Sequence, residues 1–154
     1  MNVIRVLIVD DHPSVRQGLH SLLSAYPDIK VVGEAEDGMT ALRAAEEHIP
    51  DVILLDIQLP GPNGVDIALQ LSQKSPQTKI IILTAFDNDE YLIGALGAGA
   101  YAYLLKNSSN ETVVETIRLV HQGKRLLSPS LIDPALRQLQ TLARAHVRRE
   151  IHLT

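Results

Sequence analysis

The chain has 154 residues, a net charge of −4 and no cysteine, which excludes disulfides and thiolate metal sites and suits one domain with a short extension. No apolar run approaches the roughly 18 residues of a membrane span. The start enters a strand pattern directly and shows no signal peptide. We therefore expect a cytoplasmic protein that has no contact with a membrane.

Charge is distributed unevenly along the chain. Residues 1–125 hold 10 Lys and Arg against 16 Asp and Glu, whereas residues 126–154 hold 4 against 2. An acidic body is unsuited to nucleic-acid phosphates, and the tail is too weakly basic to indicate DNA binding by itself. We predict one domain over residues 1–125 and a linker, largely helical, over residues 126–154.

The first elements alternate between strand and helix patterns. A β-branched run at residues 3–9 predicts a strand. A helix should begin at His12-Pro13, because proline suits the first helical turn, and end before Pro27. Residues 30–35 predict a second strand, and a second helix follows the turn at Asp37-Gly38.

The third strand, residues 52–55, consists of four apolar residues that run into Asp56 and a stretch of turn residues. This pattern is typical of a strand buried on both faces. Ser108 and Glu111 have the spacing of a capping box. The later elements are a helix at 65–74, a strand at 79–84, a helix at 87–96, a strand at 101–105, a helix from Ser108 that ends at Gly123, and a final helix from Asp133-Pro134.

Strands that alternate with helices predict an α/β fold with a parallel sheet covered on both faces. The doubly wound, flavodoxin-like strand order 2-1-3-4-5 makes strands one and three neighbours. Polar residues follow four of the strands at the same edge of such a sheet. They are Asp10 and Asp11 after the first strand, Asp56 after the third, Thr84 after the fourth and Lys106 after the fifth.

Three carboxylates at one edge repel by roughly 1–4 kcal/mol per pair, so they need a cation to stay ionised together. Oxygen ligands alone favour a hard ion such as Mg²⁺. A metal, a carboxylate, a lysine and a hydroxyl fit phosphoryl transfer. Asp56 could attack a phosphoryl group in line, while Mg²⁺ and Lys106 neutralise its oxygens and Thr84 donates a hydrogen bond.

These residues resemble the receiver domain of two-component response regulators, in the NarL/FixJ (LuxR-type) branch. The resemblance covers about residues 3–123. It rests on four segments: Val-Asp10-Asp11-His12, Leu-Leu-Asp56-Ile-x-x-Pro60-Gly61-x-x-Gly64, Leu83-Thr84-Ala85 and Ala98-Gly99-Ala100-x-x-Tyr103-Leu-Leu-Lys106. It implies a CheY-like fold and a domain that catalyses only its own phosphorylation and dephosphorylation.

The resemblance also implies roles for single residues. Asp56 is the phosphoacceptor, and Lys106 is the partner of the phosphate. Thr84 and Tyr103 form the switch pair. Mg²⁺ is held by Asp10, Asp11, Asp56 and the main-chain carbonyl of Gln58.

The implied phosphodonor is a sensor histidine kinase or a small acyl phosphate, and the implied result is homodimerisation that controls transcription. Leu153-Thr154 resemble the opening of a LuxR-type helix-turn-helix domain. We therefore expect DNA contact only through a domain that this chain lacks. The sequence departs from the branch at Tyr101-Ala102, which replace a small residue and a glycine and place an extra aromatic ring near the switch.

Two other functions are compatible with parts of the pattern. A small Mg²⁺-dependent phosphohydrolase with an aspartyl-phosphate intermediate could use the same residues. Such an enzyme needs a second, acid-base carboxylate two residues after Asp56, where this chain has Gln58. A flavodoxin-like FMN binder needs a phosphate loop after the first strand, where Asp10 and Asp11 would repel phosphate. His12 is expected to cap a helix or line the pocket.

Overall fold

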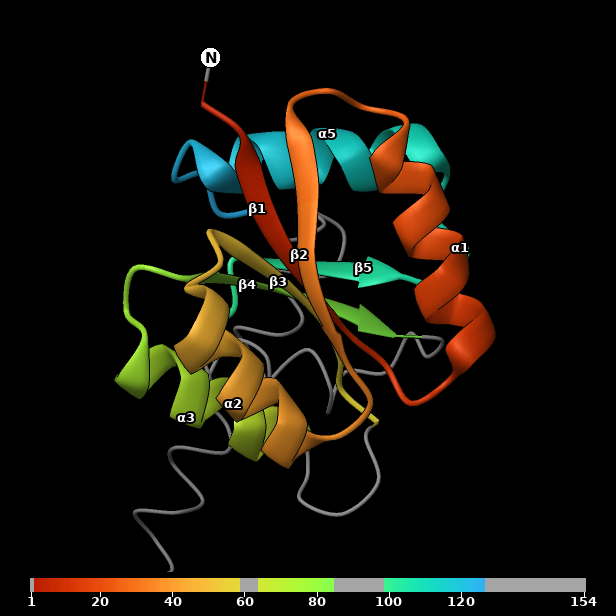
Figure 1. Ribbon diagram of the computed structural model, residues 1–154. Coiled ribbons are helices and arrows are strands. Elements are labelled where there is room, and N and C mark those ends of the chain that lie inside the picture. The colour runs from red at the N-terminus through yellow and green to blue at the C-terminus, as the bar shows by residue number, and fades with distance from the viewer. Residues whose placement is uncertain (1, 59–63, 85–98, 127–154) are drawn as a thin grey trace, which may run out of the picture.

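The computed structural model describes residues 2–58, 64–84 and 99–126. Its centre is a five-stranded parallel sheet in the order β2-β1-β3-β4-β5, which confirms the predicted doubly wound topology (Figure 1). The strands are β1 (Ile4–Val9), β2 (Ile29–Ala35), β3 (Val52–Asp56), β4 (Lys79–Thr84) and β5 (Ala102–Leu105).

Helices cover both faces of the sheet (Figure 1). The described helices are α1 (Pro13–Ser24), α2 (Gly38–His48), α3 (Gly64–Lys74) and α5 (Asn110–His121). The helices α1 and α5 pack on one face, and α2 and α3 pack on the other. No helix in these described parts is long and apolar enough to cross a membrane.

The strand β3 forms the middle of the core, and all five of its residues are buried. Ile53 and Leu55 face the α2/α3 layer, whereas Val52 and Leu54 face the α1/α5 layer. Successive side chains of a strand point to opposite faces, so a continuous apolar run is required when both faces are covered. This arrangement brings Asp56 to the carboxyl end of a fully buried strand.

The start of α5 corrects the predicted capping box. The N-cap is Ser109, whose hydroxyl accepts a hydrogen bond from the main-chain N–H of Thr112. Ser108 instead donates its main-chain N–H to the carbonyl of Leu105 at 3.0 Å, in the turn that closes β5. Because this turn uses Ser108, the helix begins one residue later than the Ser-x-x-Glu spacing indicated.

The predicted end of the same helix is confirmed. Gly123 adopts a positive φ of 95°, which favours glycine. Its N–H donates to Val120, and the N–H of Lys124 donates to Leu119. These two hydrogen bonds form a Schellman motif.

After α5 the chain returns to the sheet. Leu126 forms a parallel bridge with Ala102 of β5. The helix predicted for residues 87–96 and the helix predicted from Asp133-Pro134 lie outside the described residues.

A strained residue ends α2. Ile49 has φ 47° and ψ 63°, a left-handed conformation that costs a residue with a Cβ roughly 1–2 kcal/mol, and its side chain is largely exposed. Ile49→Gly should remove this strain, while glycine costs about 0.5–1 kcal/mol in chain entropy. We expect a net gain of about 0.5–1 kcal/mol in the free energy of unfolding, measured by urea denaturation.

Ile49→Ala is the matched control for this prediction. Alanine loses the same exposed side chain but keeps the Cβ, so the left-handed strain remains and no gain is expected. Equal stability of the glycine and alanine variants would show that the backbone conformation is not the source of the effect.

Candidate functional site

Two buried strands bring carboxylates together at the carboxyl edge of the sheet. The strands β1 and β3 are neighbours, so Asp10 and Asp56 reach the same edge. Asp11 follows directly, and ligand atoms of Asp10, Asp11, His12 and Asp56 all lie within 4.8 Å of one another. The three aspartates that the strand order was expected to bring together therefore do meet.

Lys106 is the counterion of the two most buried carboxylates. Asp10 is 1% exposed and Asp56 is 3% exposed. The Nζ of Lys106 lies 2.8 Å from Oδ2 of Asp10 and 3.0 Å from Oδ2 of Asp56. The main-chain N–H of Lys106 donates to the carbonyl of Thr84, which anchors the lysine at the end of β4. The ammonium offsets the cost of burying two carboxylates together.

Backbone groups satisfy the other oxygen of each buried carboxylate. The N–H of His12 donates to Oδ1 of Asp10 at 2.9 Å, and the N–H of Gln58 donates to Oδ1 of Asp56 at 2.9 Å. The His12 ring adds a contact from Nδ1 to Asp10 at 2.9 Å. Each carboxylate is thus held by the residue two positions further along the chain.

These contacts shift the pKa of both Asp10 and Lys106. Burial by itself raises the pKa of Asp10, but the contacts with Lys106 and His12 outweigh burial and lower it. Burial by itself lowers the pKa of Lys106, but its contacts with Asp10 and Asp56 prevail and raise it. Both directions favour the charged forms of Asp10 and Lys106 at neutral pH.

The cluster has the chemistry of a site for a hard divalent cation. Three carboxylates face one ammonium, which leaves a formal charge of −2 with His12 neutral. Two oxygens, Oδ2 of Asp10 and Oδ1 of Asp11, are buried without a hydrogen bond, although Lys106 and His12 lie within ion-pair distance. Because oxygen ligands and a doubly negative charge suit such an ion, the residues present fit it.

Comparison with known proteins identifies the family. The profile of the response regulator receiver domain matches residues 6–118. The chain belongs to the response regulator receiver family.

Relatives of this receiver include proteins that are named as regulators of transcription and of oxygen responses. It is 40% identical over 143 residues to the oxygen regulatory protein NreC of Staphylococcus epidermidis, covering 90% of this chain and 66% of NreC. It is also 40% identical to the transcriptional regulatory protein LiaR of Bacillus subtilis, covering 90% of this chain and 65% of LiaR. The chain thus spans just under two thirds of the length of these relatives.

A solved structure shares the fold closely. A LuxR-family response regulator of Aurantimonas superimposes with a TM-score of 0.81 at 32% identity, covering 89% of this chain and 98% of that chain.

The two residues predicted to form the switch lie on neighbouring strands. Thr84 is fully buried at the end of β4, beside Leu105 of β5. Tyr103 is 6% exposed and packs into the core layer of α2 and α3. Both side chains are therefore buried, and Thr84 accepts the main-chain N–H of Lys106 at its carbonyl. The switching role of this pair stays a prediction, as does the metal contact of the Gln58 carbonyl.

His12 lines the site, as the sequence indicated. It is the N-cap residue of α1 by position, but its side chain makes no capping hydrogen bond. Its ring instead contacts Asp10 and Asp11.

One residue near the site was missed by the sequence analysis. Arg16 donates a hydrogen bond to the main-chain carbonyl of Asp10 at 2.6 Å. The available signal was its spacing, four residues after His12, because helical side chains lean toward the N-terminus of their helix.

Proposed function

We propose that this receiver accepts a phosphoryl group on the carboxylate of Asp56. The observation that carries the proposal is the position of Asp56, which is a buried carboxylate at the end of β3, 3.0 Å from the ammonium of Lys106 and beside Asp10. The donor is a sensor histidine kinase or a small acyl phosphate.

In the proposed step, a carboxylate oxygen of Asp56 attacks phosphorus in line. An O–P bond forms, and the bond from phosphorus to the donor nitrogen or oxygen breaks, with its electron pair leaving on the donor. The ammonium of Lys106 and the hydroxyl of Thr84 then interact with the phosphoryl oxygens, where negative charge is concentrated. No general base is required, because the attacking group is already an anion.

The cation of this proposal is Mg²⁺, held by Asp10, Asp11, Asp56 and the main-chain carbonyl of Gln58. When bound, it supplies positive charge that offsets the repulsion between the carboxylates and the phosphoryl oxygens. Oδ2 of Asp10 and Oδ1 of Asp11 are buried without a hydrogen bond, and Lys106 and His12 are the cations or rings within ion-pair distance of them. This supports a role for both side chains in holding the ion.

Phosphorylation is proposed to act as a switch between two conformations. The hydroxyl of Thr84 would move toward the phosphoryl group, and the ring of Tyr103 would follow into the space that is vacated. Such a switch is a population shift, so the phosphoryl group must favour one state by a few kcal/mol. The proposed result is homodimerisation.

The intact protein is proposed to control transcription through a helix-turn-helix domain beyond the receiver. The name of LiaR, a transcriptional regulatory protein of which this chain covers 65%, supports that role. A cytoplasmic location belongs to the same proposal, since the receiver must meet a kinase and the intact protein must reach DNA. Residues 1–125 are proposed as the receiver, and residues 126–154 as the linker.

The proposal is tested by mapping the phosphorylated residue. The chain is treated with acetyl phosphate and MgCl₂, and the product is reduced with borohydride, which converts an aspartyl phosphate to homoserine. Peptide mass spectrometry should locate homoserine at position 56. Modification confined to another residue would refute the assignment of Asp56.

Incubation with a phosphate monoester and MgCl₂, in which release of phosphate is followed, separates a regulator from a phosphohydrolase. A regulator incorporates close to one phosphoryl group per chain and releases it by self-dephosphorylation. Sustained turnover of a phosphate monoester would favour the hydrolase instead. We propose the regulator, because Gln58, an exposed amide, follows Asp56 where a hydrolase needs an acid-base carboxylate.

A further inference from the structure

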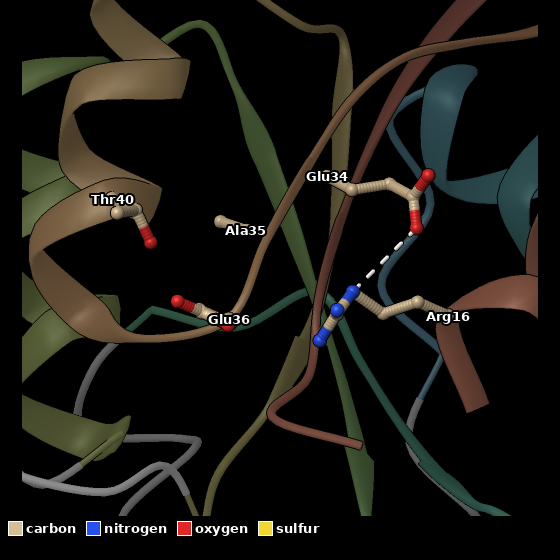
Figure 2. A pocket seen from close by; sticks show the side chains of 5 residues that line it. All are labelled: Arg16, Glu34, Ala35, Glu36 and Thr40. Carbon is tan, nitrogen blue, oxygen red and sulfur yellow. Dashed lines mark ion pairs between the residues drawn. The ribbon is translucent and has the colours of Figure 1, made fainter. Parts of the chain in front are cut away.

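Arg16 connects α1 to the acidic site through the protein backbone. Its Nη1 donates to the carbonyl oxygen of Asp10 at 2.6 Å, and its side chain is 17% exposed. Its Nε lies 3.6 Å from Oε1 of Glu34 on β2, and Figure 2 shows the two side chains reaching toward each other. A cavity of about 340 Å³ lies beside them, lined also by Ala35, Glu36 and Thr40 (Figure 2).

The carbonyl that Arg16 binds belongs to the peptide plane between Asp10 and Asp11. Because a peptide unit is planar, holding its oxygen also fixes the direction in which Asp11 leaves Asp10. The N–H of Asp10 is held separately by the carbonyl of Ala35 at 3.0 Å. Both main-chain groups of Asp10 are therefore fixed, one by β2 and the other by α1.

The two contacts of Arg16 differ in strength. A hydrogen bond from a guanidinium to a carbonyl at 2.6 Å is short and charge-assisted. The pair with Glu34 is longer than a hydrogen bond, and Glu34 is 35% exposed, so solvent weakens it. His20 also shares Glu34, with its Nδ1 3.3 Å from Oε2. The contact with Asp10 is thus the one by which Arg16 affects the site.

We propose that Arg16 is a positioning residue for the cation site. It acts through the Asp10 carbonyl to hold the Asp10–Asp11 peptide so that both carboxylates face Asp56. The proposal rests on the proposed function for the need to bind Mg²⁺ beside Asp56. Arg16 itself touches neither the cation nor the phosphoryl group in this account.

The test compares Arg16→Met, Arg16→Lys and Glu34→Gln with the wild-type chain. Methionine keeps the length of the stem but has no donor, whereas lysine restores a cationic donor. Calorimetric titration with MgCl₂ measures the dissociation constant directly. We expect the dissociation constant for Mg²⁺ to rise about 10-fold in Arg16→Met, which is the lower end of the range for loss of a contact that supports a metal ligand. The constant should return to the wild-type value in Arg16→Lys and should be unchanged in Glu34→Gln.

A kinetic readout separates positioning from general damage. Phosphorylation by acetyl phosphate is followed as a function of Mg²⁺ concentration. Arg16→Met should raise the half-saturating Mg²⁺ concentration about 10-fold, while the rate at saturating Mg²⁺ changes little. Wild-type Mg²⁺ affinity in a folded Arg16→Met chain would overturn the proposal. If that variant does not fold, Arg16→Gln is measured in its place and judged by the same affinity.

Failure of the proposed function gives a different result. If the wild-type chain binds Mg²⁺ but Asp56 is not phosphorylated, the calorimetric comparison still decides the role of Arg16. If the wild-type chain does not bind Mg²⁺, the proposed cation site and the role of Arg16 are refuted, whereas the mapping of homoserine still decides whether Asp56 is the phosphoacceptor.

Discussion

Asp56→Asn should abolish phosphoryl transfer from acetyl phosphate, lowering incorporation roughly 100-fold or more, as expected when a nucleophile is removed. Asparagine has nearly the same shape, and its oxygen can still accept the hydrogen bond from the N–H of Gln58. It lacks the negative charge that makes the carboxylate a nucleophile without a base. The measurement is incorporation of ³²P from labelled acetyl phosphate in the presence of MgCl₂.

Asp51→Asn is the matched control, because Asp51 precedes β3 at the opposite edge of the sheet from Asp56. Its Oδ2 accepts the main-chain N–H of Arg5 at 2.9 Å, a bond that the asparagine oxygen can keep. This variant should incorporate label at the wild-type rate. If Asp56→Asn incorporated ³²P at the wild-type rate, Asp56 would not be the phosphoacceptor, regardless of the result for the control.

The fold and the clustering of the acidic residues could be predicted from the sequence, because the pattern of apolar residues and the direction of the strands determine both. A continuous apolar run such as residues 52–55 is compatible with a strand covered on both faces. Because the strands are parallel, the carboxyl ends of all of them lie at one edge of the sheet. Asp10, Asp56 and Lys106 could therefore be placed together without any knowledge of side-chain geometry.

The contacts that were not predicted depend on choices between similar local geometries. Ser108 and Ser109 both offer a hydroxyl for a helix cap, and only the turn that follows Leu105 decides between them. Arg16 contacts both the carboxylate of Glu34 and a main-chain carbonyl in the structure. Its contact with the Asp10 carbonyl follows from how α1 leans on the end of β1, which sequence spacing alone does not fix.

The pairing of β1 with β2 was also beyond sequence patterns. Val6 is in register with Val31, but Leu7 is in register with Gly33, so β2 contains one extra residue at this point. Bulges are over-represented at sheet edges, where β2 lies, but they are rare in parallel pairs such as β1 and β2. A Cβ at Gly33 would lie 3.1 Å from the His48 ring, so the space for a side chain is limited there.

Lys106→Met should destabilise the metal-free chain by about 2–4 kcal/mol at pH 7. Removing one member of a buried ion pair costs about 3–5 kcal/mol, and partial exposure of Lys106 lowers this figure. The reason is that Asp10 and Asp56 then share a buried site without their ammonium. The measurement is urea denaturation in the presence of a chelator.

The loss of stability caused by Lys106→Met should depend on pH in a defined direction. In the wild-type chain the pKa of Asp10 is lowered, so its ionised form stabilises the fold above the ordinary aspartate value of about 3.9. This stabilisation is lost as the pH falls through the lowered value. Without Lys106, burial becomes the main influence and raises the pKa of Asp10, so acidification should stabilise the variant. The stability difference should therefore be largest near neutral pH and narrow toward about pH 4.

The stability difference between the wild-type chain and Lys106→Met should also change at alkaline pH. The pKa of Lys106 is raised in the folded chain, so its contribution is complete below the ordinary lysine value of about 10.4. This contribution to stability is lost as the pH rises through the raised pKa, so the wild-type chain should no longer be more stable than Lys106→Met at that pH.

A divalent cation should partly replace the missing ammonium. MgCl₂ is expected to stabilise Lys106→Met more than the wild-type chain, because it supplies positive charge to the same carboxylates. Lys79→Met is the control, since Lys79 begins β4 at the opposite edge of the sheet. The one side-chain interaction described for it places Nζ 6.0 Å from the centre of the Tyr101 ring, and the main-chain bond to Asp51 does not depend on the side chain. That change should stay within about 0.5 kcal/mol and show no dependence on Mg²⁺. If Lys106→Met instead matched the control in stability, pH dependence and response to Mg²⁺, the ammonium could not be the counterion that allows Asp10 and Asp56 to be buried together.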